Sequence, residues 1–549
     1  MSRLDRLAPV REIGQIGAAI GREFSYSLLR VLVGRDETAL QNALTQLEQA
    51  ELVFRRGEPP EAIYSFKHAL VRDAAYESLL KSRRQPLHGQ IARTLEERFS
   101  DIVASQPEIV AHHFTAAGLV EPAIDYWLKA GQHAARRSAN AEALNHLARG
   151  LELLPTIDDP MLRNKWELLL QTLLGHSLRA TKGWSVDSVK RAYTRALQLC
   201  KESGLDEHTL PAVFGLWTWH FLRAALDEAQ ALAEHLVNTA ENADDSVFKV
   251  LAHEALGFTL FARGKFAPAH AALKRSISMC EDSKAAAYLD LSAQDPRVHV
   301  RLYDGMALWL LGYPDQALRI CAEGRRYADA SQHPFSEAMA RTISLRVHQF
   351  RGEAAVVERE ADAAIALCEE HGFVHYLAMA LILRGWASAQ QGEFDKGIAE
   401  IQDGLEKVRT TGALLFESYA LGLLADVCIK NERYEQAFSF LDQAKLRLDQ
   451  ENSERFYAAE IYRLLGETYL RSRRDLDQAE RYLCKGLKVA REQKAKSLEL
   501  KLCMSIYDLH ELRQNADKYR SQLGEIYGSF SEGFDTRDLV NAKSRLTNA

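Results

Sequence analysis

Two short motifs of this 549-residue chain begin like sites of known chemistry, and both lack a residue that the chemistry needs. The glycines from Gly14 to Gly21 do not have the Gly-x-Gly-x-x-Gly spacing of a dinucleotide loop, and no strand precedes them. His253 and Glu254 begin a zinc-protease motif, but Gly257 stands where its second histidine is required. A phosphate loop, Gly-x-x-x-x-Gly-Lys-Ser/Thr, occurs nowhere. The sequence thus predicts no catalytic residue and no cofactor, and an enzyme with an unrecognised site is the weakest alternative.

Histidine and cysteine give no clear metal site either. His112 and His113 are adjacent, and adjacent side chains on a helix point about 100° apart and rarely share one ion, so we expect them to pack. The cysteines are scattered without a close pair, as buried apolar residues of a reducing compartment would be. They are Cys200, Cys280, Cys321, Cys368, Cys428, Cys484 and Cys503.

Four large aromatic or cationic side chains are candidates for binding instead of catalysis: Trp217, His220, Arg384 and Trp386. Their rings and charges offer the contact area and the charge-assisted hydrogen bonds that anchor a protein or peptide partner, or a small effector. Core packing is the alternative interpretation for each tryptophan. Which of the two applies depends on the elements that carry these residues.

Those elements belong to a repeat of about forty residues. Small or apolar residues recur at this spacing along the chain. A turn residue such as Gly264 or Gly392 stands five positions before most of them, so each unit is predicted to be a helix, a turn and a second helix. The recurring residues are small or apolar, as close helix packing requires. They stand at intervals of 40, 40, 48, 40, 40, 40, 42 and 40 residues: Val189, Ala229, Ala269, Ala317, Val357, Gly397, Ala437, Ala479 and Tyr519.

The segments Leu256–Ala269 and Leu383–Gly397 resemble tetratricopeptide repeats, in which a Leu-Gly in the first helix precedes a Gly-aromatic turn and an Ala-bearing second helix. The usual period is about 34 residues, so we expect longer helices here. Glu432 departs from the pattern because it replaces the turn glycine. In such arrays the first helices present a continuous concave surface, and the four candidate side chains would lie there.

Two interruptions of the period are expected to form loops. Eight extra residues between Ala269 and Ala317 fall at Ser283–Pro296, and Lys182–Trp184 lengthens another turn. A surface excursion is the simpler interpretation of both, and a functional insertion is the alternative.

The first 80 residues predict a small winged-helix domain. Ile13–Ile20, Ser27–Val33 and Glu37–Ala50 have the pattern of short amphipathic helices, and Leu52–Arg56 with Ala62–Phe66 that of a hairpin, to which we expect strand to be confined. The third helix would enter a DNA groove, yet it carries glutamates and no Lys or Arg, whereas phosphate contacts need cations. Direct nucleic-acid binding is therefore not expected.

The whole chain is predicted to be all-α, a tetratricopeptide-like helical solenoid preceded by the winged helix. We divide it into a winged-helix domain over residues 1–80, a helical connector with atypical repeats over 81–180, and the solenoid over 181–549. Its 69 basic and 75 acidic residues give a net charge of −6 without a long run of one sign, which argues against a nucleic-acid or membrane surface. Because no segment is predicted to be a signal peptide or a membrane span, we expect a cytoplasmic protein.

Phe66–Leu80 resembles the region that follows the nucleotide-binding module of bacterial STAND-type signalling ATPases, including MalT-like activators and the ATPases joined to class III adenylate cyclases. Ile16–Phe24, Leu308–Leu318 and Gly533–Leu539 are similar to the winged helix, the repeats and the end of the same proteins. The resemblance implies a non-catalytic regulatory or sensor module that passes a signal to an ATPase or a cyclase. A fragment of a MalT-like transcriptional regulator is the alternative, although no basic helix-turn-helix ends this sequence.

Overall fold

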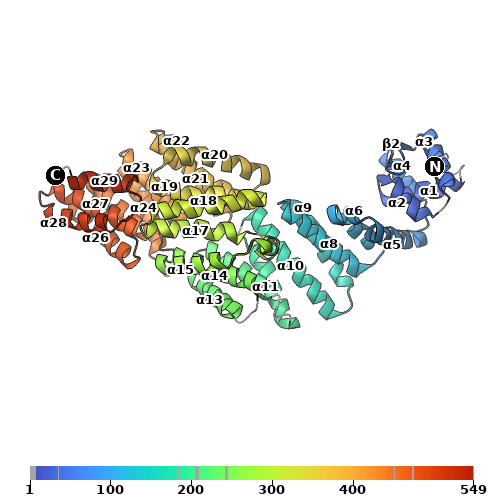
Figure 1. Cartoon of the computed structure of the whole chain (residues 1–549), viewed down its shortest axis with the longest axis horizontal. Coiled ribbons are helices and arrows are strands. Elements are labelled where there is room, and N and C mark those ends of the chain that lie inside the picture. Colours follow the sequence, from blue (N-terminus) through green and yellow to red (C-terminus); the bar gives the residue numbers. More distant parts are fainter. Residues whose placement is uncertain are drawn as a thin grey trace. The chain divides into compact units, whose positions relative to one another are not determined.

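The computed structural model describes the chain except for residues 1–7, 35, 184, 205–208, 242–244, 293, 451, 473–474 and 548–549. The chain divides into two compact units, which Figure 1 shows in blue to cyan and in green to red. One unit takes in the described residues up to Ala134 together with Glu142–Leu170. The other takes in Ala135–Ala141 and the described residues from Gln171. The domain boundaries that we placed at residues 80 and 180 stay predictions.

The first unit begins with three helices and a small sheet. Ser25 caps the second helix by accepting a hydrogen bond from the Leu28 N–H at 3.2 Å, and Asp36 caps the third in the same way. The strands are antiparallel in the order β1-β3-β2, with Phe24 opposite Tyr64. The elements are α1 (Ala8–Ile20), β1 (Glu23–Ser25), α2 (Tyr26–Val33), α3 (Glu37–Gln49), β2 (Val53–Arg56) and β3 (Ile63–Phe66).

The predicted helices and hairpin of this region are confirmed, but the expectation that strand is confined to the hairpin is wrong. β1 adds a third strand beside β3. Three residues are too few to show the alternation of apolar and polar side chains that marks a strand in sequence. The assignment of these elements to a winged-helix domain stays a prediction.

The rest of the first unit is helical. His113 is buried there, and its Nδ1 lies 2.8 Å from Nδ1 of His88. Burial lowers the pKa of His113 to about 3 and that of His88 to about 4, so both rings are neutral at pH 7. The helices are α4 (Ala69–Glu77), α5 (Lys81–Arg98), α6 (Ser100–Ser105), α7 (Pro107–Ala116), α8 (Val120–Arg136), α9 (Asn140–Leu153) and α10 (Pro160–Lys182), which ends in the second unit.

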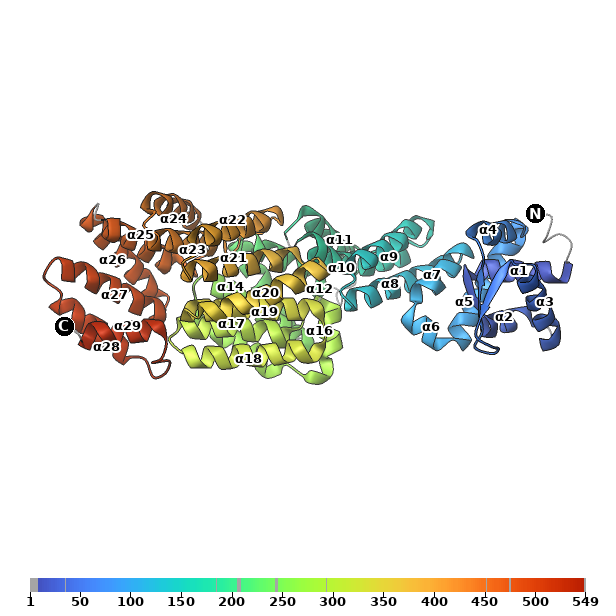
Figure 2. The same ribbon diagram turned by 90° about the horizontal axis from the view of Figure 1, so that it is seen from above.

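The second unit is a solenoid of paired helices, so the predicted all-α, tetratricopeptide-like fold is confirmed (Figure 2). The first helices of the pairs are α12 (Thr209–Leu222), α14 (Ser246–Ala262), α17 (Pro296–Leu310), α19 (Pro334–Arg351), α21 (Val374–Gln390), α23 (Glu417–Lys430), α25 (Ala458–Ser472) and α27 (Lys496–Leu512). The second helices are α13 (Leu226–Glu241), α15 (Phe266–Met279), α18 (Pro314–Ser331), α20 (Ala354–His371), α22 (Phe394–Thr410), α24 (Tyr434–Leu448), α26 (Leu476–Glu492) and α28 (Asp517–Gly528). α11 (Asp187–Ser203) precedes the first pair, and α29 (Arg537–Thr547) follows the last. None of the described helices is long and apolar enough to cross a membrane.

The residues that recur every forty positions lie where paired helices approach most closely. A Cβ atom added to Gly385 of α21 would lie 2.6 Å from the carbonyl oxygen of Gly397 in α22. The turns between paired helices use the left-handed backbone region, with φ of 94° at Gly392. Glu432 adopts the same region, with φ of 56°, so the turn keeps its shape where the glycine is replaced.

The two helices of a pair differ in burial. Every residue of α17 is buried, whereas α18 buries only a stripe that includes Ala317. The first helices are enclosed because successive windings of the solenoid touch. The N–H groups of Leu414 and Leu415 donate to the carbonyl oxygen of Leu222 at 2.8 and 3.0 Å. The expectation of a continuous concave surface is therefore wrong over α17, and the inner face holds separate cavities.

The eight extra residues before Ala317 do not form a surface loop. They add a short turn, η3 (Asp282–Lys284), and a helix, α16 (Ala285–Ser292), which packs against α12 and α14. Tyr288 and Asp295 are buried. The expected surface excursion is wrong here, because the insertion carries apolar side chains that fill the interior. Of the other interruption, Trp184 lies outside the described residues.

Candidate functional site

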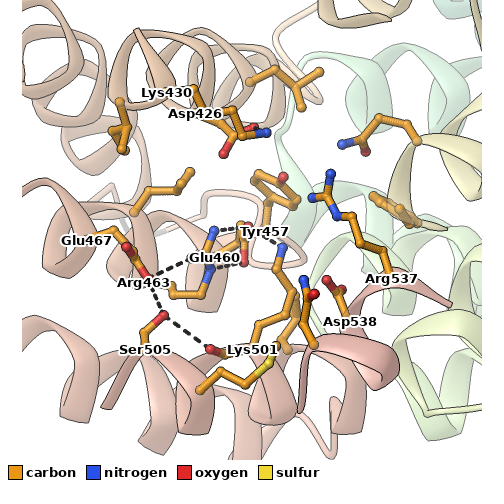
Figure 3. Close-up of a pocket in the computed structure, with 18 of the residues that line it drawn as sticks. Asp426, Lys430, Tyr457, Glu460, Arg463, Glu467, Lys501, Ser505, Arg537 and Asp538 are labelled. Carbon is orange, nitrogen blue, oxygen red and sulfur yellow. Dashed lines mark hydrogen bonds and ion pairs between the residues drawn. The ribbon is translucent and has the colours of Figure 1, made fainter. Parts of the chain in front are cut away.

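A pocket of about 200 Å³ lies among the inner helices of the last repeats, and we call it the charged pocket (Figure 3). Inner helices of six consecutive repeats, α17, α19, α21, α23, α25 and α27, contribute to its lining, and α29 adds a further wall. Apolar side chains such as Trp386 and Leu423 form part of the wall. The charged lining residues are Asp426, Lys430, Glu460, Arg463, Glu467, Arg471, Lys501, Asp508, Arg537, Asp538 and Arg545.

Glu460 and Arg463 of α25 form the centre of the charged pocket. Arg463 is three residues after Glu460 on one helix, so the guanidinium reaches both carboxylate oxygens. Its Nε donates to Oε2 at 2.9 Å and its Nη2 to Oε1 at 2.8 Å. Lys501 of α27 donates to the same carboxylate. The Glu460 side chain is only 4 % exposed, and it carries two cations as partners.

A second buried carboxylate continues this network. Glu467 accepts hydrogen bonds from Arg463 at 3.4 Å and from Arg471 at 3.1 Å. The hydroxyl of Ser505 also donates to it. Figure 3 shows the chain of contacts from Lys501 through Glu460 and Arg463 to Glu467. Two carboxylates therefore lie among three cations, and the buried charges of α25 are neutralised by neighbours on α25 and α27.

The network sets the protonation of its carboxyl groups. Burial raises the pKa of Glu460, but the charges of Arg463 and Lys501 outweigh burial and hold the pKa well below its usual range. The pKa of Glu467 is lowered in the same way, against its burial, mainly by Arg463. Both groups are ionised at neutral pH. A carboxylate with so low a pKa is a weak base, which is a poor property for general base catalysis.

The side of the charged pocket that α29 forms differs from its centre. Arg545 holds α29 to α27, with its Nε and Nη2 donating to Asp508 at 2.7 and 2.8 Å. Arg537 is exposed, and Asp538 is half-buried. In the part of the chain that the structure describes, neither forms an ion pair. Figure 3 shows both on the opposite side of the pocket from Glu467, so charges of both signs are open to a ligand there.

The segment before α29 is fixed to a helix far away in sequence. Glu532 accepts hydrogen bonds from the N–H groups of Asp315 and Gln316, both at 2.9 Å, at the start of α18. The two segments are 217 residues apart at Asp315. A carboxylate in this place satisfies free N–H groups at the positive end of the helix dipole. The wall formed by α29 is therefore held in place by the winding of the solenoid.

The four predicted binding residues are not brought to one place. Trp386 is 1 % exposed and lines the charged pocket. Trp217 is 2 % exposed, donates to Thr259 Oγ1 at 2.9 Å and lines a different cavity. Arg384 is held by Asp362 at 3.1 Å and by Glu400 at 3.0 Å. His220 is half-buried, and burial lowers its pKa. A binding role for these residues stays a prediction.

Sequence reasoning missed the charges of α25 and α27. A signal was available, because Glu460, Arg463, Glu467 and Arg471 recur at spacings of three and four in a first helix. First helices are otherwise rich in apolar residues, so charges at this spacing on an inner helix require partners on its neighbours. Among the described residues, no group of three or more His, Cys, Asp and Glu side chains is placed to hold a metal ion.

A family model described as Tetratricopeptide repeat matches residues 417–492. This segment covers α23 to α26, and it supplies two of the walls of the charged pocket. An uncharacterized protein of Rhizobium meliloti (strain 1021) is 25% identical over 471 residues, which are 84% of this chain and 45% of that protein. The chain thus spans less than half the length of this curated relative.

Several solved structures share the helical fold at low identity. A Rap protein complexed with Competence and Sporulation Factor is 13% identical, with a TM-score of 0.49 over 67% of this chain and 98% of that one. The apo form of the quorum sensor NprR from B. thuringiensis is 15% identical, with a TM-score of 0.40 over 67% of this chain and 99% of that one. A STAND protein with a tetratricopeptide repeat sensor from Pyrococcus horikoshii is 13% identical, with a TM-score of 0.28 over 95% of this chain and 63% of that one. These similarities concern the arrangement of helices.

Proposed function

We propose that the chain is a non-catalytic regulatory module that binds a protein partner at the charged pocket. The observation that carries the proposal is the contrast within this pocket. Its central charges are paired with one another, whereas Arg537 and Asp538 on the α29 side form no ion pair among the described residues. A partner segment with charged side chains can pair with both without breaking the central network.

The shape of the pocket suits an extended segment better than a small metabolite. Its lining comes from several inner helices, and Trp309, Phe350 and Trp386 add aromatic surface beside the charges. Aromatic rings next to arginine are typical of the residues that dominate protein binding. The low pKa of Glu460 supports a binding role over general base catalysis.

The signalling context is part of the same proposal. The resemblance to the regulatory region of STAND-type ATPases, some of them linked to adenylate cyclases, suggests that the partner belongs to such a bacterial signalling system. We therefore expect the purified chain neither to hydrolyse ATP nor to form cyclic AMP, since it lacks a phosphate loop. A cytoplasmic location follows from this role.

Direct DNA binding is not part of the proposal. Three cations near α3 are paired with acidic groups on or beside that helix. Arg30 lies 3.8 Å from Glu37, and Arg55 lies 3.5 Å from Glu48. Lys67 is 2.8 Å from Glu51. Charges that are neutralised in this way give little of the phosphate attraction on which DNA affinity depends.

The proposal is tested by site-specific cross-linking. A photoreactive benzoylphenylalanine in place of Asn541, which lines the charged pocket, is compared with the same group in place of Lys488 on the outer helix α26, where the side chain is 78% exposed. In lysate of the source organism, we expect a protein to be captured from position 541 and not from position 488. Mass spectrometry identifies it.

The captured protein is then purified, and its affinity is measured. Arg537→Glu reverses a charge on an exposed side chain, so the variant is expected to fold and to bind at least about tenfold more weakly. Arg481→Glu on the outer helix α26 is the control and should bind as the wild type does. Equal capture from both positions, or unchanged affinity in folded Arg537→Glu, contradicts the proposal.

A further inference from the structure

A second cavity, of about 40 Å³, lies among the inner helices of the earlier repeats and is partly open; we call it the aromatic cavity. It shares no lining residue with the charged pocket. Rings dominate its wall: Phe258 stacks on Tyr303 with centroids 3.8 Å apart, and Trp217 stacks on Phe221 at 5.2 Å. Gln294, which follows the inserted helix α16, lines it as well.

One charged side chain of this cavity has no counter-ion. Arg346 of α19 is 3 % exposed, and its guanidinium lies 4.2 Å from the ring centre of Phe416. Its Nη2 donates to the sulfur of Met379 at 3.2 Å, which is a weak acceptor. Its Nε has no hydrogen-bond partner, and no described carboxylate lies within ion-pair distance. A buried cation without an anion is costly, so this arrangement requires an explanation.

Two carboxylates near the aromatic cavity, Glu454 and Glu254, bind other groups and not Arg346. Glu454 accepts hydrogen bonds from the N–H groups of Phe416 at 2.6 Å and Ser418 at 3.0 Å. Glu254 lies 3.0 Å from Nδ1 of His299. Neither pairs with Arg346, so the protein itself does not neutralise this guanidinium.

Neutral polar side chains lie beside Arg346 in the aromatic cavity and could donate hydrogen bonds to a bound anion. Burial raises the pKa of Tyr303, so its hydroxyl keeps its proton and can donate. Burial lowers the pKa of His375 to about 4, and the charge of Arg346 adds to this effect. The Nδ1 of His375 has no partner among the described residues. One fixed positive charge is thus surrounded by rings and neutral polar groups.

We propose that the aromatic cavity binds the carboxylate group of a monoanionic ligand, with Arg346 as its counter-ion. A guanidinium matches a carboxylate in shape and charge, and the rings accept a short apolar stem. A phosphate dianion is disfavoured because one cation would leave a net charge buried. A cavity needs about 10–15 Å³ to hold one water molecule. A cavity of about 40 Å³ therefore admits roughly a carboxylate and one or two methylene groups. The remainder of a larger ligand would lie outside the cavity.

The carboxylate has two possible sources, a free short-chain acid or the carboxylate of a peptide. This inference goes beyond the proposed function, because it concerns other residues and another ligand. The full chain is tested first with radiolabelled propionate in equilibrium dialysis at constant ionic strength. We expect saturable binding that excess propionate displaces and excess propionamide does not. Absence of saturable binding, or equal displacement by propionamide, overturns the proposal.

Variants assign the binding to Arg346. Arg346→Met keeps an unbranched apolar stem and removes the charge, and it should weaken propionate binding by about tenfold or more. Arg341→Met is the control on the same helix, because Arg341 is paired with Glu337 at 2.9 Å, and it should bind propionate as the wild type does. Full binding by folded Arg346→Met overturns the assignment. If Arg346→Met does not fold, Tyr303→Phe and Arg346→Lys are used: both should weaken binding several-fold, and unchanged binding in both overturns the proposal.

A peptide arm separates the two sources. A short peptide with a free terminal carboxylate is compared with its C-terminally amidated form as a competitor of propionate. Stronger competition by the free carboxylate identifies a peptide ligand, and absence of competition by either peptide identifies a small acid; both outcomes support the carboxylate site. Equal competition by both peptides shows that the cavity selects apolar bulk and overturns the proposal. Neither result depends on the protein partner of the charged pocket.

Discussion

The charged pocket and the aromatic cavity lie among inner helices of one solenoid, but they differ in how their buried cations are satisfied. In the charged pocket, Arg463 bonds both oxygens of Glu460 and also reaches Glu467. In the aromatic cavity, Arg346 contacts the sulfur of Met379 and the ring of Phe416. The same side chain is thus part of a neutralised network in one place and an isolated cation in the other.

This difference separates two uses of buried charge. Removing one partner of a buried pair leaves the other partner uncompensated, and this is strongly destabilising. An isolated buried arginine has no such partner, so its removal relieves a cost that the protein otherwise bears. Substitutions in the two regions should therefore change the free energy of unfolding by different amounts, with different signs or with a different dependence on pH.

The largest effect is expected from Arg463→Met. This change leaves Glu460 with Lys501 alone and Glu467 with Arg471 and Ser505. We expect the free energy of unfolding to fall by about 3–5 kcal/mol, as for other broken buried pairs. Urea denaturation measures it. Lys407→Met is the control, because the pair of Lys407 with Asp403 is exposed and should contribute less than about 1 kcal/mol. If Arg463→Met lowers the free energy of unfolding as little as Lys407→Met does, Arg463 is not part of a stabilising buried network.

Mild acid should destabilise the aromatic cavity and not the charged pocket. The folded pKa of His375, about 4, lies below its ordinary value of about 6.5, so the unfolded chain binds more protons between these values. The stability from neutral His375 is therefore lost as pH falls from about 6.5 toward 4, by about 2 kcal/mol between pH 7 and pH 5. His375→Gln should remove that part of the pH dependence.

Glu460 provides the opposite case. Its folded pKa is depressed, so its contribution is fully present above its unfolded pKa of about 4.3 and is lost only as pH falls further. Glu460→Gln should leave the change between pH 7 and pH 5 as in the wild type. Thermal melts at the two pH values distinguish the variants. If His375→Gln keeps the full acid sensitivity, or if Glu460→Gln lowers it, the assignment of this part of the acid sensitivity to His375 in the aromatic cavity is wrong.

Arg346→Met should change the free energy of unfolding little in the absence of ligand. It removes the attraction between the guanidinium and the ring of Phe416, and it also removes the cost of a buried, uncompensated cation. We expect these effects to cancel to within about 1 kcal/mol in either direction. The same urea experiment compares it with Arg463→Met. A loss as large as that of Arg463→Met would show that Arg346 is structurally paired after all.

The repeat could be predicted from the sequence because its period is fixed by close contacts. Gly385 and Gly397 recur where two backbones nearly touch, and larger side chains there would collide with the opposite helix. Contacts between windings could not be predicted in this way. The carbonyl oxygen of Leu222 meets Leu414 and Leu415 only after several repeats, and no local pattern marks such a pair.

In the candidate sites, too, local contacts could be predicted from the sequence and contacts between distant segments could not. Charges three residues apart on one helix, such as Glu460 and Arg463, are visible in sequence. The significance of Arg346 depends on which groups surround it in space. In the sequence it is one of three arginines of α19, with Arg341 and Arg351, and nothing in the sequence distinguishes it from them. The inserted helix α16 was expected to be a loop because the period of the repeats says nothing about residues added between them.

The smallest effect concerns the wall that α29 adds to the charged pocket. Arg545 bonds both oxygens of Asp508 at 2.7 and 2.8 Å, but the two side chains are 31% and 34% exposed, so solvent weakens their attraction. Asp508→Asn should therefore lower the free energy of unfolding by less than about 1 kcal/mol. Because this pair joins α29 to α27, amide hydrogen exchange should become faster in α29, while α12 beside the aromatic cavity keeps its wild-type protection. Exchange is followed by mass spectrometry, and Lys407→Met again serves as the surface control. Faster exchange in both α29 and α12 would show that the two cavities open together and would contradict their treatment as independent regions.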